Sequence, residues 1–391
     1  MTHPALLLTY DFPPMLGGIA RALGEIARHA EGRVRVSTGQ VDGWEAWDRA
    51  SGLPVDRLAV PSRRLKTLPC LVRWGLHADR LVRQHHPAFL WAGNVKPAGH
   101  VARWLGTRRG IPYGLITYGL DLELLHDQAR RSPRRRRGIR ELVAGAAGAV
   151  AISGWTRDRY VELAERLGVP AGPDRVRVVP LGVDTQRFAP RPAGGPRAGS
   201  CTLLTVARLV PHKGVDEALA LLAGLRAEGY TCHYVVAGEG PDRPRLEALA
   251  AELGVAGQVR FLGAVSEAEL PSLYQAADLY VGLSRVDGPE VEGFGLALLE
   301  AQAAGLPVLA GRGGGTAECV EDGVSGLLLP PTDRREVLAA AVALLRHPER
   351  AHALGQAGRA RAERHFGWAR VVADLEAAAR AFTPPAARSA R

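Results

Sequence analysis

The chain has few of the residues that crosslink small folds, and it has no apolar segment long enough to cross a bilayer. Its 391 residues include four cysteines, at positions 70, 201, 232 and 319, without a Cys-x-x-Cys pair or a His/Cys cluster. A disulfide framework and a structural zinc site are therefore disfavoured, and free cysteines are typical of a reducing compartment. The longest apolar run, around residues 142–152, falls short of the ~20 residues of a membrane span, and the N-terminus lacks the basic region of a signal peptide. We expect a cytoplasmic protein, free or bound peripherally at the inner face of the membrane.

Lysine and aromatic residues are also scarce. Only three of the 50 basic residues are lysines, Lys66, Lys96 and Lys213. An arginine excess of this size is typical of codon bias, so a lysine carries more information here than an arginine. Aromatic residues make up 6% of the chain, and none lies within the arginine-rich segment 130–140, which makes nucleic acid an unlikely partner.

The chain instead has a charge that differs between its two halves. The net charge is +10, but residues 1–190 carry 29 basic and 17 acidic side chains, whereas residues 191–391 carry 21 and 23. Two basic segments account for much of the excess. Residues 62–86 mix arginines with Leu, Val and Trp, as interfacial membrane helices do. Residues 130–140 hold seven arginines, a charge that suits anionic lipid and, by charge alone, nucleic acid as well. A solvated helix face and a flexible charged loop are the alternatives, and the sequence leaves both open.

Short apolar runs alternate with helical patterns along the whole chain, which predicts an α/β protein of two doubly wound, Rossmann-like domains in tandem. Strands are expected at 5–10, 33–38, 89–93, 113–119, 149–153, 176–183, 201–207, 233–240, 259–265, 279–284, 307–311 and 326–330. Helices are expected at 17–30, 71–84, 156–168, 333–346 and 368–382. We predict an N-terminal acceptor-binding domain over 1–190, a linker over 191–200, a C-terminal nucleotide-sugar-binding domain over 201–367, and a C-terminal helix and tail over 368–391. Ligands of such sheets bind at the carboxyl ends of the strands, so the cleft between the domains is the expected site.

The strongest motif is VEGFGLALLE, within residues 291–316. Gly293 and Gly295 allow the backbone to approach a ligand closely, and the helix that follows offers free N–H groups and the positive end of its dipole. Such a helix start suits a diphosphate. Glu292 would lie over the same ligand, and Glu300 can accept hydrogen bonds from vicinal hydroxyls such as those of a ribose. The alternative is a buried helix with two ordinary glutamates.

Two further loops follow predicted strands. In VARLVPHKG, Arg208 and Lys213 would balance the charge of a nucleotide diphosphate as it leaves. In DFPPMLGGI, Gly17 and Gly18 open a helix, although the segment is not the G-x-G-x-x-G of dinucleotide sites. Solvated surface charges and a simple Gly-Gly turn are the alternatives.

In this order the elements resemble the retaining glycosyltransferases of family 4, which have the GT-B fold, and most of all the bacterial enzymes similar to phosphatidylinositol mannosyltransferases. The resemblance covers essentially the whole chain and also includes VVPLGVDTQRF (178–188) and GGGTAECVEDGVSGLLLPP (313–331). It implies an interdomain cleft, and we expect the C-terminal helix to pack back on the N-terminal domain.

The resemblance implies a role for each matching residue. Arg208, Lys213 and Glu292 would carry the catalysis, with the two cations on the donor diphosphate and Glu292 on the sugar hydroxyls. The remaining donor-binding residues would be Gly17, Gly18, Leu262, Gly263, Phe294, Gly295, Leu296 and Glu300, with Glu300 on the ribose and residues 261–263 lining the base pocket.

The acceptor side departs from the family pattern. The family often has a His-Gly-x-Asp/Glu element facing the reacting centre, whereas this chain has Tyr118-Gly119-Leu120-Asp121. Tyr118 either substitutes for the histidine or the acceptor contact has moved, and Asp11, Tyr118 and Asp121 are the candidate acceptor-side residues. An Asp-x-Asp motif is absent, and Asp121-Leu122-Glu123 is better interpreted as a helix start. We therefore predict metal-independent transfer, with no cofactor and a nucleotide sugar as co-substrate.

The sequence thus predicts a retaining hexosyltransferase that uses GDP-mannose or a UDP-sugar. Its acceptor would be a hydroxyl of a lipid-linked or anionic molecule, with an anionic membrane surface as a further partner. A soluble metabolite or natural product is the alternative acceptor. A basic nucleic-acid-binding protein and a nicotinamide-dependent oxidoreductase are the rival classes, and the missing G-x-G-x-x-G argues against the latter.

Overall fold

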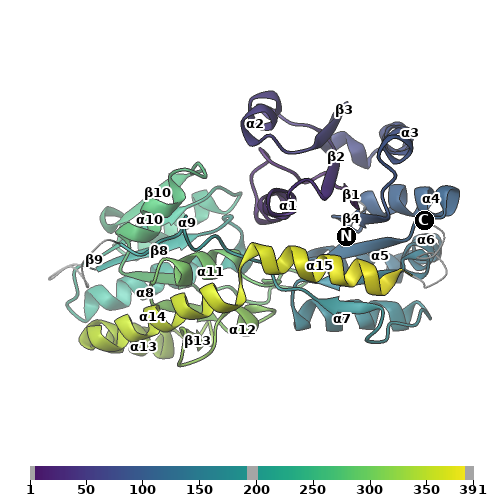
Figure 1. Ribbon diagram of the computed structural model, residues 1–391. Coiled ribbons are helices and arrows are strands. Elements are labelled where there is room, and N and C mark those ends of the chain that lie inside the picture. Colours follow the sequence, from purple (N-terminus) through teal and green to yellow (C-terminus); the bar gives the residue numbers. More distant parts are fainter. Residues whose placement is uncertain (1–4, 192–200, 384–391) are drawn as a thin grey trace. The chain divides into compact units, whose positions relative to one another are not determined.

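The computed structural model describes residues 5–191 and 201–383, and the chain forms two compact α/β units (Figure 1). Unit 1 comprises residues 1–181 and 368–391, and unit 2 comprises residues 182–367. Most of the predicted linker, residues 192–200, lies outside the described part. The segment directly before it packs on unit 2, because Val183 N–H donates to the Phe366 carbonyl at 2.7 Å and Phe188 packs edge-on against Tyr274.

Unit 1 contains a seven-stranded parallel sheet in the order β3-β2-β1-β4-β5-β6-β7. Its strands are β1 Ala5–Leu8, β2 Val34–Gln40, β3 Val55–Pro61, β4 Phe89–Ala92, β5 Tyr113–Thr117, β6 Gly148–Ala151 and β7 Val176–Val178. Its helices are α1 Gly18–His29, α2 Trp44–Ser51, α3 Leu68–His85, α4 Ala98–Arg109, α5 Leu120–Arg131, α6 Pro133–Gly145, α7 Gly154–Arg166 and α15 Trp368–Phe382, with a 3₁₀ turn, η1, at Ser62–Lys66.

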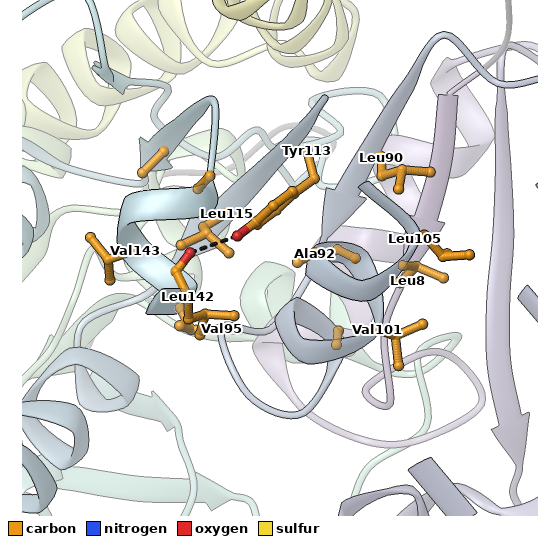
Figure 2. Packing of buried hydrophobic residues seen from close by; sticks show 14 of the residues in the cluster. Leu8, Leu90, Ala92, Val95, Val101, Leu105, Tyr113, Leu115, Leu142 and Val143 are labelled. Atoms are coloured by element: carbon orange, nitrogen blue, oxygen red, sulfur yellow. Dashed lines mark hydrogen bonds between the residues drawn. The ribbon is translucent and has the colours of Figure 1, made fainter. Parts of the chain in front are cut away.

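The core of unit 1 forms where the fully apolar strands pack against helices on the sheet faces. Strands β1, β4 and β5 are buried along their whole length, as expected for a parallel sheet covered on both sides. Figure 2 shows these strands packed against α4 and α6, with the Tyr113 hydroxyl donating to the Leu142 carbonyl at 2.7 Å. The labelled side chains include Leu8, Leu90, Ala92, Val101, Leu105, Leu115, Leu142 and Val143.

The C-terminal helix α15 packs on unit 1, which confirms the expectation that this helix packs back on the N-terminal domain. It lies against α1, and Phe382 at its end packs edge-on against Trp91 of β4 with ring centroids 6.5 Å apart. Gly148 makes room for this ring, because a Cβ there would lie 2.4 Å from Phe382 Cε1. Arg33 Nε donates to Glu376 Oε1 at 2.8 Å at the edge of the contact.

Unit 2 contains a six-stranded parallel sheet in the order β10-β9-β8-β11-β12-β13. Its strands are β8 Cys201–Val206, β9 Cys232–Ala237, β10 Val259–Gly263, β11 Leu279–Gly282, β12 Val308–Gly311 and β13 Leu327–Leu329. Its helices are α8 Val215–Ala227, α9 Arg243–Glu252, α10 Leu270–Ala276, α11 Leu296–Ala303, α12 Thr316–Cys319, α13 Arg334–Arg346 and α14 Pro348–His365, with 3₁₀ turns η2 Pro211–Lys213 and η3 Ala256–Gln258.

The arginine-rich segment 130–140 is helical, so the alternative of a flexible loop is wrong. It spans the end of α5 and most of α6, with Ser132 capping α6 by accepting from Arg135 N–H. Arg136 and Arg140 donate to the carbonyls of Arg166 and Leu167, which terminate α7. Cations at a helix C-terminus stabilise the unpaired carbonyls and the negative end of the dipole. Part of this charge therefore serves the fold.

Candidate active site

In unit 2, two loops that follow neighbouring parallel strands carry the predicted catalytic residues. Arg208 and Lys213 follow β8, and Glu292 follows β11, which pairs directly with β8. The Lys213 ammonium donates to Glu292 Oε2, and each side chain keeps 20% of its surface exposed. Burial raises the pKa of Glu292, but the charge and hydrogen bond of Lys213 outweigh it, and the pKa lies below its ordinary range. Glu292 is therefore ionised at neutral pH.

A second pair joins the same two loops. His212 Nδ1 lies 2.8 Å from Glu290 Oε2, and the His212 side chain is almost fully buried. Burial, and then the charge of Lys213, lower the pKa of His212, so the ring is neutral at pH 7 and Nδ1–H can donate to Glu290. Sequence reasoning missed this pair, although both residues stand next to motif positions.

The start of α11 depends on glycine. Gly295 caps the helix with φ +110°, a left-handed conformation, and a Cβ there would lie 2.7 Å from Leu298 Cδ1. Phe294 is buried against Phe366, so only its backbone can meet a ligand, and Leu296 is the first residue of the helix. The backbone at this helix start therefore requires glycine at position 295, and the binding of an anion there stays a prediction.

Glu300 points into the interior of unit 2. It is 3% exposed, and its Oε2 accepts from the Tyr274 hydroxyl at 2.6 Å. Tyr274 in turn stacks on Tyr280. The contact of Glu300 with a ribose stays a prediction.

The ends of β8, β9 and β10 lie close together through glycines. Gly263 has φ +73° and accepts at its carbonyl from Gly238 N–H at 2.8 Å, and Leu262 before it is half-buried. At Gly238, φ is +140° and a Cβ would lie 1.8 Å from the Ala207 carbonyl oxygen. Sequence reasoning did not single out Gly238, although it directly follows a predicted strand. Arg208 is exposed and forms no hydrogen bond or ion pair through its side chain within the described residues.

In unit 1, the loop after β1 carries Asp11. Asn94, which follows the adjacent strand β4, donates to Asp11 Oδ2 at 3.0 Å, and its own Oδ1 accepts from the Thr9 hydroxyl at 2.7 Å. Lys66 lies over the Tyr10 ring at 4.1 Å. Burial raises the pKa of Asp11, while Tyr10, Lys66 and Asn94 oppose the rise. Asn94 was missed because a lone asparagine after a strand carries no motif.

Tyr118 and Asp121 bring unpartnered polar atoms to the carboxyl edge of the same sheet. Asp121 Oδ1 accepts from the Tyr118 and Gly119 N–H groups at 3.0 and 2.9 Å, so the segment is a helix start as predicted. Asp121 Oδ2 and the Tyr118 hydroxyl are buried and have no hydrogen-bond partner among the described residues. Burial raises the pKa of Asp121 to about 6 and holds that of Tyr118 well above its ordinary value. Gly17, with φ +139°, is the N-cap of α1, and Gly18 is the first residue of that helix, which follows β1 in the chain.

No group of three or more His, Cys, Asp or Glu side chains suited to a metal ion occurs within residues 5–191 and 201–383. Nor does any helix in those ranges combine the length and apolar character that crossing a membrane requires.

Comparison with family models matches residues 16–187 to "Glycosyltransferase Family 4" and residues 188–361 to "Glycosyl transferases group 1". A GDP-mannose-dependent alpha-(1-6)-phosphatidylinositol monomannoside mannosyltransferase of Mycobacterium tuberculosis is 33% identical over 389 residues, which cover 95% of this chain and 96% of that protein. A D-inositol 3-phosphate glycosyltransferase of Geodermatophilus obscurus is 40% identical over 265 residues, 64% of this chain and 56% of that one.

Solved structures show the same fold. Anabaena Alr3699/HepE in complex with UDP and glucose has a TM-score of 0.77 at 20% identity, covering 96% of this chain and 98% of that one. A sucrose-phosphate synthase from Thermosynechococcus elongatus has a TM-score of 0.76 at 21% identity, covering 97% and 98%. The fold is therefore GT-B, as predicted.

Proposed function

We propose that this protein mannosylates a phosphatidylinositol-like lipid. The premise is its family: the chain belongs to the glycosyltransferases, with a family 4 N-terminal half and a group 1 C-terminal half. The chain is a glycosyltransferase that uses a nucleotide sugar. GDP-mannose as the donor, retention of the anomeric configuration and independence of metal are parts of the proposal.

The observation that carries the proposal is the contact between Lys213 and Glu292 beside the glycine-capped start of α11. A diphosphate bound at this helix start would compete with Glu292 for the Lys213 ammonium. Glu292, once released, is an ionised acceptor for sugar hydroxyls. Lys213 and the exposed Arg208 would stabilise the negative charge that develops on the leaving diphosphate, which supplies the electrostatics for which other enzymes use a metal ion.

The unpartnered atoms of unit 1 support an acceptor rich in hydroxyls. A buried polar atom without a partner costs on the order of 1–3 kcal/mol, and a bound ligand relieves that cost. Asp121 Oδ2 can accept from a hydroxyl, and the neutral Tyr118 phenol can donate to one. Asp11, held by Asn94, adds a second carboxylate. Carboxylates and a phenol are the side chains that a polyol headgroup would need.

Cations at the same edge support a phosphate on that acceptor. Lys96 Nζ donates to Gln128 Oε1 at 3.0 Å and forms no ion pair within the described residues. The pKa of Lys96 is lowered first by burial and then by the charge of Arg135. The pKa of His100 is lowered first by burial and then by the charge of Lys96. The first turns of α4 and α6 contain no acidic residue. Positive charge at two helix starts is unfavourable alone and favours a bound anion.

The outer face of α3 supports attachment to a lipid surface. Its inner face holds the buried Trp74, whose Nε1 donates to Ser37 Oγ at 3.0 Å. On successive turns of the outer face, Leu68, Val72 and Leu76 are 74%, 56% and 60% exposed, and we call them the α3 apolar stripe. The exposed arginines around it, which form no ion pair within the described residues, are Arg63, Arg64, Arg73 and Arg80. Exposed apolar residues flanked by arginines fit an anionic lipid surface.

A donor and acceptor panel tests the proposal. The purified protein is given GDP-mannose, UDP-glucose or UDP-N-acetylglucosamine with phosphatidylinositol in vesicles, and the products are identified by mass spectrometry and their anomeric configuration by NMR. We expect an α-mannosyl lipid from GDP-mannose. Transfer only from a UDP-sugar would overturn the donor, a β-linked product would overturn retention, and transfer only to a soluble inositol phosphate would overturn the lipid acceptor.

A further inference from the structure

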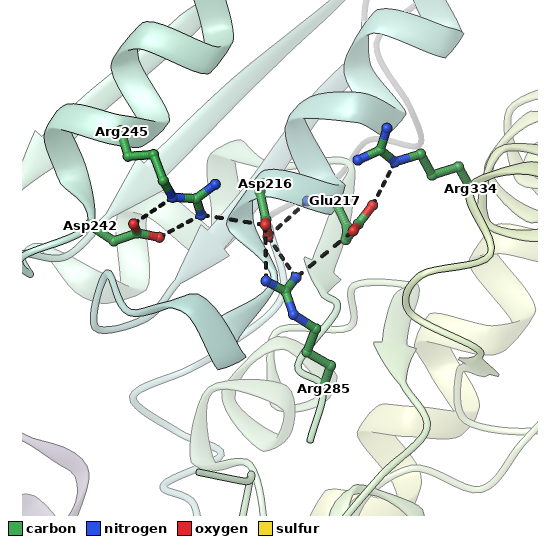
Figure 3. Close-up of polar contacts among 6 residues, drawn as sticks. All are labelled: Asp216, Glu217, Asp242, Arg245, Arg285 and Arg334. Atoms are coloured by element: carbon green, nitrogen blue, oxygen red, sulfur yellow. Dashed lines mark hydrogen bonds and ion pairs between the residues drawn. The ribbon is translucent and has the colours of Figure 1, made fainter. Parts of the chain in front are cut away.

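An arginine that no motif includes connects the two loops of the donor side in unit 2. Arg285 follows β11, and its guanidinium donates to both carboxylate oxygens of Asp216, at 2.8 and 2.9 Å. The side chains are 19% and 13% exposed. Figure 3 shows Asp216 between Arg285 and Arg245, in a network of three acidic and three basic residues. Arg245 also binds Asp242, and Arg334 binds Glu217.

The partner of Arg285 belongs to the loop of Lys213. Asp216 lies in the first turn of α8, three residues after Lys213, and Gly214 between them caps that helix. The backbone makes the same connection, because Arg285 N–H donates to the His212 carbonyl at 2.8 Å. At Gly214 the two segments are so close that a Cβ would lie 1.9 Å from the Leu283 carbonyl oxygen. Arg285 thus attaches its own segment to both sides of Lys213.

The same segment leads directly to Glu290 and Glu292. Asp287 and Glu290 exchange two backbone hydrogen bonds of 2.9 Å, which closes the chain after Arg285 into a tight turn. His212–Glu290 and Lys213–Glu292 are then the only side-chain pairs, within the described residues, that join the end of this turn to the Lys213 loop. One of these two pairs contains the ammonium that the donor diphosphate would take.

We infer that Arg285 is a positioning residue, whose two-pronged bond to Asp216 holds the Lys213 loop and the Glu290–Glu292 segment together while the donor replaces Glu292 at Lys213. This inference rests on the proposed donor site. The hydrogen bonds and charge of Arg285 outweigh the effect of burial and lower the pKa of Asp216, so the pair stays ionised at neutral pH. A lysine would keep the charge but lose the planar two-pronged geometry.

The test compares Arg285→Gln and Arg285→Lys with Arg334→Gln. Arg334 belongs to the same network but is 62% exposed and, among the residues that the structure describes, bonds only to Glu217, so its removal is the matched control. The first measurement is amide hydrogen exchange in the ligand-free protein. We expect faster exchange across residues 211–214 and 286–292 in Arg285→Gln, partial recovery in Arg285→Lys and no local change in Arg334→Gln.

The second measurement is GDP affinity by calorimetry together with the KM for GDP-mannose. We expect Arg285→Gln to raise both the Kd for GDP and the KM for GDP-mannose about tenfold, because misplaced binding groups lose that much affinity or more. Arg285→Lys should regain part of the lost affinity. Unchanged exchange across the two segments in Arg285→Gln, or an equal change in Arg334→Gln, would overturn the inference. If the wild type bound neither GDP nor UDP, the donor proposal would fail, whereas the exchange measurement would still decide whether Arg285 holds the segments together.

Discussion

The two units present opposite states of their polar groups at the carboxyl edges of their sheets. In unit 2 four residues of the candidate site form two pairs, Lys213 with Glu292 and His212 with Glu290. In unit 1 the Tyr118 hydroxyl and Asp121 Oδ2 are buried without a partner in the described part of the chain. A charged ligand must therefore displace an internal partner in unit 2, whereas a hydroxyl-bearing ligand in unit 1 fills bonding capacity that the protein leaves open. The difference fits the ionic donor and the polyol acceptor that we propose.

Removing the paired charges of unit 2 should have the largest effect. Lys213→Ala and Glu292→Ala should each lower kcat about 10²- to 10³-fold, the usual cost of removing one group that stabilises transition-state charge. Lys213→Ala should also weaken GDP binding, measured by calorimetry. Arg334→Gln serves as the control, and full activity in both alanine variants would remove these residues from the site.

Asp121→Asn tests whether the open capacity of unit 1 serves the acceptor. Asparagine keeps an oxygen for the Tyr118 and Gly119 N–H groups but replaces the unpartnered carboxylate oxygen with an amide. We expect kcat/KM for phosphatidylinositol to fall about 10²-fold, in line with the loss of an interaction to a reacting hydroxyl, with an unchanged Kd for GDP. A loss confined to GDP binding would show that the contrast between the units is wrong.

The α3 apolar stripe tests whether unit 1 also contacts the lipid surface. Replacing Leu68, Val72 and Leu76 together with serine should lower co-sedimentation with phosphatidylinositol vesicles about tenfold or more, since each buried apolar side chain contributes roughly 1.5–3 kcal/mol. Val324→Ser, which replaces an apolar side chain of unit 2 that is 49% exposed, is the control. Equal binding by the triple variant and the wild type would contradict this role.

The pH dependence of stability gives a smaller effect of defined sign. Because burial raises the pKa of Asp121 from 3.8 to about 6, the folded protein binds this proton more tightly than the unfolded chain does. Stability is therefore lost as the pH rises from about 4 to about 6, by an amount on the order of 2–3 kcal/mol. Asp121→Asn should raise Tm at pH 7.5 and not at pH 4, measured by differential scanning calorimetry. A variant less stable than the wild type at pH 7.5 would contradict the open state of this carboxylate.

The smallest expected effect is that of chelation. If Arg208 and Lys213 supply the electrostatics at the diphosphate, transfer measured in excess EDTA should equal transfer with added Mg²⁺. Strict dependence on Mg²⁺ or Mn²⁺ would overturn metal independence and leave the contrast between the units incomplete.

Much of the fold was predictable, because fully apolar runs such as residues 5–8 and 308–311 have the signature of strands buried in a parallel sheet. Strand β3 was not, since Val55–Pro61 is only half-buried and mixes charged with apolar residues. The boundaries of α5 and α6 could not be predicted, because the arginine run between them has no apolar pattern. Arg136 and Arg140 in that run bond to the carbonyls at the end of α7, about 30 positions further along the chain.

The loops that carry the candidate site could be predicted from motifs, but their arrangement could not. Lys213 and Glu292 each stand in a motif, yet their contact spans 79 positions and follows from the pairing of β8 with β11. Asn94 and Arg285 bond to partners that only the folded chain brings near. Neither residue type nor spacing marks them in the sequence.

The passage of the chain through the two units has a consequence for synthesis. Unit 1 consists of residues 1–181 and 368–391, with the whole of unit 2 between these parts. On the ribosome, the first part of unit 1 therefore emerges with the place of Phe382 against Trp91 and Gly148 still unfilled. All residues of unit 2 are therefore synthesised before unit 1 is complete. Unit 1, although it begins the chain, is the last to complete its core.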